Sequence, residues 1–258
     1  MYKILKNLIP KQTCLDCQED LILKSKNKEV EEKIAENKKI LLKKLSNNEI
    51  IEIDNVNKII FNEKLIEKIK ENIGDFYFIN NIAATINGFS SVPHRDGQSF
   101  GFNYEGIKKS SKIFKILFYF NGNNQKIDKG LDVNFFDINL KNIFYNKKLY
   151  MKLNFYYEYY FRKKIMKTLR LNLGDVIIMD SNTWHRATPQ NNLNSEDGKF
   201  KCHKILLDFE VVTEENLALE YATHVRRSFL EEKNIPNNLT NNIFNEHLNK
   251  AGIKTINV

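Results

Sequence analysis

Between residues 76 and 212, short runs of β-branched, aliphatic and aromatic residues follow one another with turn residues between them. The strongest runs are 112–120 (KIFKILFYF), 176–179 (VIIM) and 204–212 (KILLDFEVV), and the weaker ones are 76–79, 82–86, 131–136 and the alternating 169–173. Parallel strands need helical crossovers, and no helical pattern separates these runs. The spacing therefore favours an antiparallel barrel or jelly roll over a parallel sheet.

Helical patterns flank this region on both sides. They comprise a helix after Pro10 that runs through Leu23, amphipathic segments at 29–45 and 61–73, a glycine at Gly74 suited to end the latter, and a helix at 214–230. We therefore expect a mainly β protein with flanking helices (α+β) around a jelly-roll core. We expect a single domain, with a helical N-terminal part at 1–75, the core at 76–212 and a helical C-terminal extension at 213–258.

The composition favours a globular protein with anionic partners. Among 258 residues, 40 are Lys or Arg and 32 are Asp or Glu, so the formal net charge is +8. No apolar run approaches the roughly 20 residues of a membrane span, and the N-terminus lacks a signal-peptide pattern. Three cysteines are too few for a disulfide framework, which predicts a cytoplasmic protein. Cys14 and Cys17 form a single C-x-x-C pair, incomplete for structural zinc, and on a helix they would share one face.

Two of the five histidines have neighbours that suggest chemistry. His94 and Asp96 form an H-x-D motif after a predicted strand, and in extended chain both side chains lie on the same face. His185 follows the predicted strand 176–179 and a polar turn. Two imidazoles and one carboxylate form the facial ligand set of non-heme Fe(II) oxygenases, which leaves positions open on one side of the metal. A surface His–Asp pair in a turn is the alternative interpretation of the bare motif.

The chain resembles the Fe(II)/2-oxoglutarate-dependent oxygenases, and among them the phytanoyl-CoA dioxygenase-like branch. The matching pieces are His94-x-Asp96, the Gly174-Asp175 strand that leads to His185, and the stretch that begins at Pro189. The resemblance implies a double-stranded β-helix (cupin-like) with Fe(II) on His94, Asp96 and His185. It further implies a dioxygenase that uses 2-oxoglutarate and O2 and hydroxylates a small molecule, with release of succinate and CO2.

The family binds the far carboxylate of 2-oxoglutarate with a basic residue, usually arginine, on the strand after the second histidine. No arginine occurs between Arg186 and Arg226, so the resemblance assigns this role first to Lys204 and second to Lys201. A lysine pairs with a carboxylate as a point charge and lacks the bidentate fork of arginine. Three further candidates for contact with 2-oxoglutarate or substrate lie on strands that would line the barrel. They are Thr85, Asn87 and Tyr119.

The segment 141–170 carries nine Lys or Arg, one Glu and nine aromatic residues. Such a surface suits an anionic or carrier-linked metabolite, or single-stranded nucleic acid. The alternative interpretation is a twisted hairpin whose aromatic residues pack on the core while its lysines stay solvated. Two alternative functions therefore stay open. One is a nucleic-acid or nucleotide dioxygenase with the same iron site. The other, suggested by the missing arginine, is a non-catalytic cupin-like binding protein.

Overall fold

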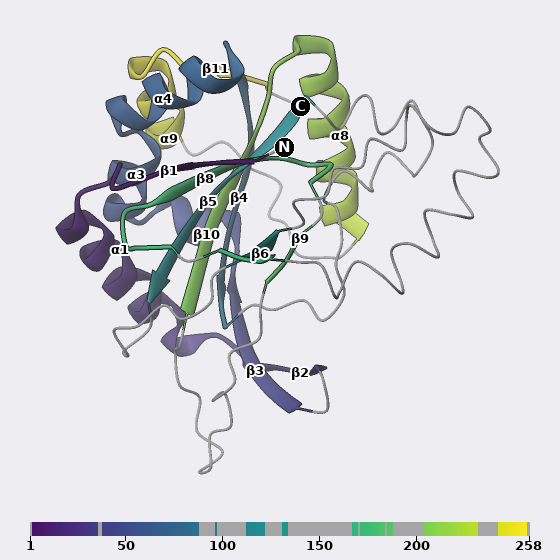
Figure 1. Ribbon diagram of the computed structural model, residues 1–258. Helices are drawn as coiled ribbons and strands as arrows, with labels where there is room; N and C mark the ends of the chain where they lie inside the picture. Colours follow the sequence, from purple (N-terminus) through teal and green to yellow (C-terminus); the bar gives the residue numbers. More distant parts are fainter. Residues whose placement is uncertain are drawn as a thin grey trace, which may run out of the picture.

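A large antiparallel sheet forms the centre of the computed structural model, which describes residues 2–35, 38–87, 96, 112–121, 131–133, 167–169, 171–183, 185–187, 204–231 and 242–256 (Figure 1). The strands lie in the order β1 (Tyr2–Leu5), β8 (Val176–Asp180), β5 (Ile113–Asn121), β10 (Lys204–Val212), β4 (Tyr77–Ile86), β3 (Lys38–Leu45) and β2 (Glu31–Ala35). The short β11 (Lys254–Thr255) pairs with β4 in parallel. Strands distant in sequence are therefore neighbours in the sheet.

A second, smaller sheet consists of β7 (Lys167–Thr168), β6 (Leu131–Val133) and β9 (His185–Ala187), in that order. Apolar contacts connect this part of the chain to the large sheet, because Leu169 just after β7 packs in one cluster with Leu117 of β5 and Met179 of β8. The face of the large sheet that carries Leu117 and Met179 is called the inner face below.

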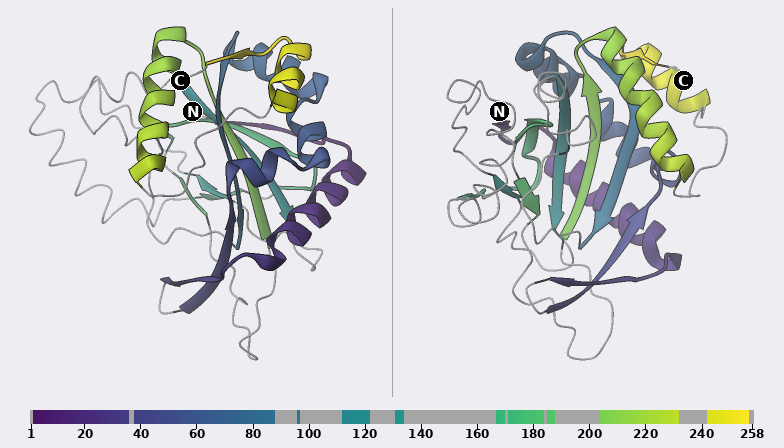
Figure 2. Two further views of the ribbon diagram at one scale, coloured as in Figure 1. Left: turned by 180° about the vertical axis from the view of Figure 1, so that it is seen from behind. Right: turned by 90° about the vertical axis from the view of Figure 1, so that its right-hand side faces the viewer.

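Helices cover the opposite face of the large sheet. They are α1 (Lys11–Lys24), α2 (Asn47–Ile51), α3 (Asp54–Ile60), α4 (Glu63–Ile73) and α9 (Asn242–Lys250), and the short 3-10 turn η1 (Ser25–Asn27) follows α1. The helix α8 (Glu215–Glu231) packs on the inner-face side through Tyr221, Ala222 and their neighbours. Figure 2 shows α8 and the other helices on opposite sides of the sheet.

Along the central strand β10, successive side chains point alternately to the two faces of the sheet. Its odd-numbered residues enter the helix-covered core, where Phe209 packs against Phe78 and Phe118 at ring-centroid distances of 5.7 and 6.1 Å. Its even-numbered residues face inward, among them Asp208 and Glu210. Both are buried, with 7% and 2% of their surface exposed. The fold therefore places charged side chains in the interior of the molecule.

Several predicted elements are confirmed with small shifts at their ends. The helices α1, α4 and α8 and the strands β5, β8 and β10 correspond to predicted segments, and Gly74 ends α4 with φ of 83°. The runs 76–79 and 82–86 form one strand, β4, with a register shift relative to β10. The alternating run 169–173 is not a strand in its described residues, since β7 ends at Thr168. Leu169 and Leu171 instead pack in the apolar cluster on the inner face.

The predicted amphipathic helix at 29–45 is wrong, since β2 and β3 form an antiparallel hairpin there. The buried residues Leu42 and Leu45 are three apart, a spacing typical of one helix face, but they lie in β3, whose pairing with β4 establishes the strand. Lys43, expected on a solvated helix face, is instead buried and donates to the carbonyls of Ser25 and Lys26. The N-terminal 75 residues are thus a mixture of helices and strands.

The turn at Gly174 and Asp175, just before β8, ties the N-terminal segment to this strand. The carbonyl of Gly174 accepts hydrogen bonds from the backbone N–H groups of Leu8 and Ile9. The buried carboxylate of Asp175 accepts from the Lys6 ammonium (2.7 Å) and from the Asn7 backbone N–H (2.9 Å). These contacts help to hold β1 against β8 and fix the path of the chain before α1.

The two cysteines of the C-x-x-C pair lie on α1 and face the core. Burial raises the pKa of Cys14 to about 12 and raises the pKa of Cys17 as well, so both are neutral thiols at physiological pH. They act as small apolar packing residues, as their spacing suggested. In the part of the chain that the structure describes, none of the helices has the length and apolar character needed to cross a bilayer.

Candidate functional site

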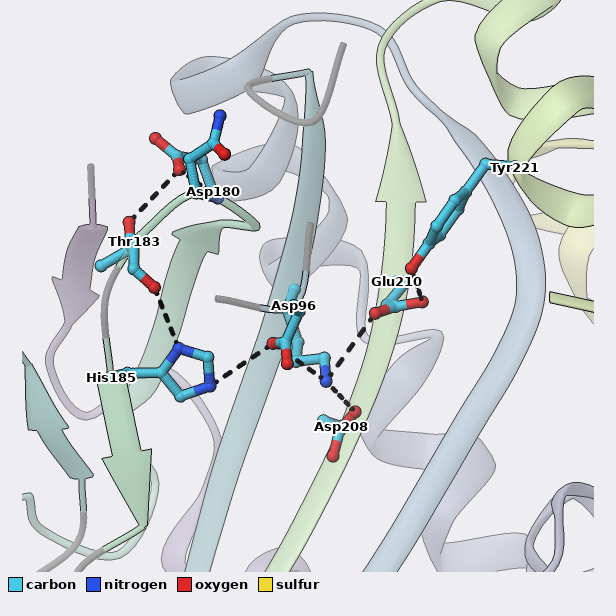
Figure 3. A network of polar contacts seen from close by, with 9 residues as sticks. Asp96, Asp180, Thr183, His185, Asp208, Glu210 and Tyr221 are labelled. Carbon is cyan, nitrogen blue, oxygen red and sulfur yellow. Dashed lines mark hydrogen bonds and ion pairs between the residues drawn. The ribbon is translucent and has the colours of Figure 1, made fainter. Parts of the chain in front are cut away.

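His185 begins β9 and is oriented by the turn before it. Oδ1 of Asp180 accepts a hydrogen bond from the backbone N–H of Asn182 (2.8 Å) and one from the Thr183 hydroxyl (3.3 Å). The carbonyl oxygen of Thr183 lies 3.0 Å from Nδ1 of His185 (Figure 3). Because a carbonyl only accepts, Nδ1 carries the proton, and Nε2 of the neutral ring keeps the lone pair that a metal needs.

Nε2 of His185 faces the carboxylate of Asp96, whose Oδ2 lies 3.4 Å away. Two donors that bind one metal at about 2.1 Å, with an angle of about 90–110°, are separated by about 3.0–3.4 Å. Both side chains are mostly buried, with 8% and 15% of their surface exposed. The pair therefore fits a shared metal ion in separation, burial and donor type.

The third predicted ligand, His94, lies outside the described residues, as do Lys201 and all of the basic segment 141–170 except 167–169. Within the described ranges, no three histidine, cysteine, aspartate or glutamate side chains are grouped so that they could hold a metal ion. The described residues thus supply two of the three predicted donors, and the role of His94 stays a prediction.

A buried charged cluster adjoins Asp96 on the inner face. The ammonium nitrogen of Lys115 on β5 lies 3.2 Å from Oδ2 of Asp96, 3.5 Å from Oδ1 of Asp208 and 3.7 Å from Oε1 of Glu210. The other oxygen of Glu210 accepts a hydrogen bond from the Tyr221 hydroxyl on α8 at 3.1 Å. Figure 3 shows these groups as one polar network that continues to His185.

Burial and charge shift the pKa values in this cluster. Burial alone would lower the pKa of Lys115, but the nearby carboxylates, Asp208 foremost, raise it well above its usual value. Lys115 is therefore charged at neutral pH. Burial raises the pKa of Asp208 to about 6 despite the opposing effect of Lys115. Burial, and then the charge of Glu210, raises the pKa of Tyr221, so its hydroxyl stays protonated and donates to Glu210.

Sequence reasoning missed this cluster, although a signal was present. Asp208 and Glu210 interrupt an apolar strand at every second position, which places them on one face together with Lys204. Lys115 similarly interrupts the run KIFKILFYF. A charged residue in an apolar central strand needs a partner in the interior, so the opposite charges in the two strands predict each other.

The predicted 2-oxoglutarate contacts in the described residues lie further along the same face. Lys204 is buried at the start of β10, and Tyr119 is buried opposite Leu206. The amide of Asn87 is engaged by the backbone, since it donates to the Leu41 carbonyl (3.2 Å) and lies 3.4 Å from the Lys204 backbone nitrogen. Asn87 also has a positive φ of 58°, which asparagine tolerates. Asn87 therefore connects β3 to the start of β10 through these contacts. Its contact with a co-substrate stays a prediction.

If His185 binds a metal, as predicted, the Asp180 turn should affect metal affinity without contacting the metal itself. We expect Asp180→Ala to weaken Fe(II) binding about 10- to 100-fold, because the turn that orients His185 loses its two side-chain hydrogen bonds. Anaerobic calorimetric titration with Fe(II) measures this effect. Asp16→Ala, which removes an aspartate that pairs with Gln12 on the surface of α1, serves as the control. Equal affinities in the two variants would show that the turn does not orient the ligand.

The chain matches no protein-family model and no curated protein sequence. Its fold is similar to that of a solved structure, the non-heme alpha ketoglutarate dependent epimerase SnoN from nogalamycin biosynthesis. The TM-score is 0.52 at 9% sequence identity, over 83% of this chain and 77% of SnoN. This similarity, together with the sheet order, confirms the predicted mainly β, cupin-like class with flanking helices.

Two further structures show weaker similarity. SnoN in complex with Fe3+, alpha ketoglutarate and nogalamycin RO gives a TM-score of 0.48 at 8% identity, over 86% of this chain and 84% of that chain. HygX from Streptomyces hygroscopicus, with nickel and 2-oxoglutarate bound, gives 0.49 at 8% identity, over 82% of each chain. At these identities the likeness concerns the fold alone, and the phytanoyl-CoA dioxygenase-like branch stays a prediction.

Proposed function

We propose that this protein is an Fe(II)/2-oxoglutarate-dependent oxygenase that hydroxylates a small molecule. The observation that carries the proposal is the meeting of His185 and Asp96, which are far apart in the sequence and lie with Nε2 and Oδ2 3.4 Å apart. The Nδ1 contact with Thr183 prepares His185 for this role. The fold supports the proposal, because it is similar to that of SnoN, a non-heme alpha ketoglutarate dependent epimerase.

His94, Asp96 and His185 would hold the iron. When bound, the iron supplies the oxidative chemistry that couples breakdown of 2-oxoglutarate to succinate and CO2 with oxidation of a substrate. The apolar inner face around Leu117, Ile177 and Met179 keeps water away from the reacting groups, since these side chains are at most 2% exposed. In this proposal, the described residues would provide two of the three ligands and an apolar wall that excludes water beside them.

Lys204 is the favoured partner for the far carboxylate of 2-oxoglutarate. It lies on the same face of β10 as Asp208 and precedes it by four residues, or about 13 Å of extended strand. Its lysine side chain and a five-carbon dicarboxylate can together span such a distance. Tyr119 lies diagonally across the β5–β10 ladder from Lys204, so its hydroxyl would support the same carboxylate.

We also propose that the chain acts as a single oxygenase domain. One buried cluster contains Leu21 of α1, Phe209 of β10 and Leu248 of α9, so segments from both ends of the chain share a core with the central strand. A division at residue 75 or 213 would cut through this core.

The proposed function is tested by succinate release from 2-oxoglutarate in the presence of Fe(II) and O2. We expect Lys204→Met to raise the KM for 2-oxoglutarate about 10- to 100-fold, because a charge-assisted contact with a carboxylate is lost. Lys44→Met is the matched control, since Lys44 lies at the surface and pairs with Glu31. Absence of Fe(II)-dependent succinate release from the unaltered protein would favour the non-catalytic binding protein. An unchanged KM in Lys204→Met would remove Lys204 from the site.

A further inference from the structure

Lys115 occupies its position because of the register between β5 and β10. It lies directly opposite Glu210 in this ladder, while Asp208 is paired with Leu117 and is therefore a diagonal neighbour of Lys115. Side chains at opposite and diagonal positions of an antiparallel ladder can reach one another. The ammonium group consequently contacts both carboxylates of β10 and, beyond them, Asp96.

The two carboxylates of β10, Asp208 and Glu210, would compete with 2-oxoglutarate for open positions on the proposed iron. Carboxylate oxygens bind Fe(II), and a facial set of three ligands has open positions that any nearby carboxylate can fill. Asp208 and Glu210 both contact the same ammonium group as Asp96. A metal ion beside Asp96 would attract them, and each one that binds would remove a position that 2-oxoglutarate needs.

We propose that Lys115 is a positioning residue that keeps Asp208 and Glu210 away from the iron and so preserves the open positions for 2-oxoglutarate. This inference rests on the proposed function. Glu210 is held from both sides, since Oε1 faces Lys115 and Oε2 accepts the hydrogen bond from Tyr221. When Asp96 binds the metal, Lys115 retains the two carboxylates of β10 as its partners, so the buried charges stay compensated.

Removal of the Lys115 ammonium group should have opposite effects on the affinities for Fe(II) and for 2-oxoglutarate. In Lys115→Met we expect Fe(II) to bind about tenfold or more tightly, because the freed carboxylates join the metal. We expect 2-oxoglutarate to bind at least about tenfold more weakly, because the open positions are filled. Anaerobic calorimetry with Fe(II) measures the first effect. Titration of the Fe(II) protein with 2-oxoglutarate, followed by the visible charge-transfer band, measures the second.

Three further variants separate positioning from a structural role. The triple variant Lys115→Met/Asp208→Asn/Glu210→Gln removes the competing carboxylates and should restore 2-oxoglutarate binding. Lys115→Gln/Glu210→Gln leaves Asp208 as the one competing carboxylate of β10 and should show the same two shifts if Lys115→Met fails to fold. Lys112→Met, at a surface lysine that pairs with Glu214, controls for the loss of one positive charge and should change neither affinity.

Unchanged or weaker Fe(II) binding in folded Lys115 variants would overturn the inference, as would loss of both ligands without rescue in the triple variant. Failure of the proposed function has a different signature, because the unaltered protein would then lack Fe(II) or 2-oxoglutarate binding before any substitution is made.

Discussion

Replacing His185 with alanine should lower Fe(II) affinity by more than the about 100-fold that loss of a supporting partner costs. The replacement removes the nitrogen that faces Asp96 at 3.4 Å, so only Asp96 and the predicted ligand His94 would remain to hold the metal. The fold should remain intact, because β9 pairs with β6 through backbone groups that alanine retains. Anaerobic calorimetry with Fe(II), together with thermal unfolding of the same samples, measures both expectations.

The matched control for this variant is His247→Ala. His247 lies on α9 and stacks on Phe61 with a ring-centroid distance of 5.3 Å, so its loss removes an imidazole away from the site. Fe(II) affinity should be unchanged in this control. Equal losses in both variants, or full Fe(II) binding in His185→Ala, would contradict the assignment of His185 as a ligand.

Gly174→Ala should be among the most destabilising single substitutions in the chain. An added Cβ would lie 2.4 Å from the carbonyl oxygen of Ile9, and the residue has φ of 94°, a conformation that alanine rarely adopts. The backbone cannot easily yield, since the Gly174 carbonyl binds the N–H groups of Leu8 and Ile9. We expect a loss of about 3 kcal/mol or more in the free energy of unfolding, measured by denaturant titration.

Gly74→Ala separates the two contributions to this loss. Gly74 also has a positive φ, of 83°, but an added Cβ there would meet nothing within 4 Å. Its substitution should therefore cost only the conformational strain, about 1–2 kcal/mol. Equal losses at the two glycines would show that the contact with Ile9 does not restrain the N-terminal segment.

The sequence predicted those elements whose pattern has a single interpretation. The runs that became β5, β8 and β10 are apolar, β-branched and bounded by turns, so they form central strands. The prediction for the segment 29–45 is wrong because apolar residues three or four apart, such as Val30 and Ile34 or Leu42 and Leu45, indicate a helix, whereas the segment forms the hairpin of β2 and β3. The pairing of β3 with β4 establishes the strand, and such long-range pairing is not visible in a local pattern.

The candidate site shows the same limit. The H-x-D motif and the second histidine are signals of residue type. The structure brings Asp96 and His185 to 3.4 Å from each other, and their role as metal ligands stays a prediction. The charged cluster around Lys115 depends instead on the register of two strands that are about 90 residues apart in the chain. No local pattern gives that register. Only the presence of buried charges in apolar strands hinted that partners existed.

Anaerobic addition of Fe(II) and then 2-oxoglutarate to the purified protein tests the central claim most directly. The proposed function predicts stoichiometric Fe(II) binding and a visible metal-to-ligand charge-transfer band on addition of 2-oxoglutarate, and it predicts loss of the band in His185→Ala. Fe(II) binding without any band in the unaltered protein would contradict the claim and favour a cupin-like binding protein.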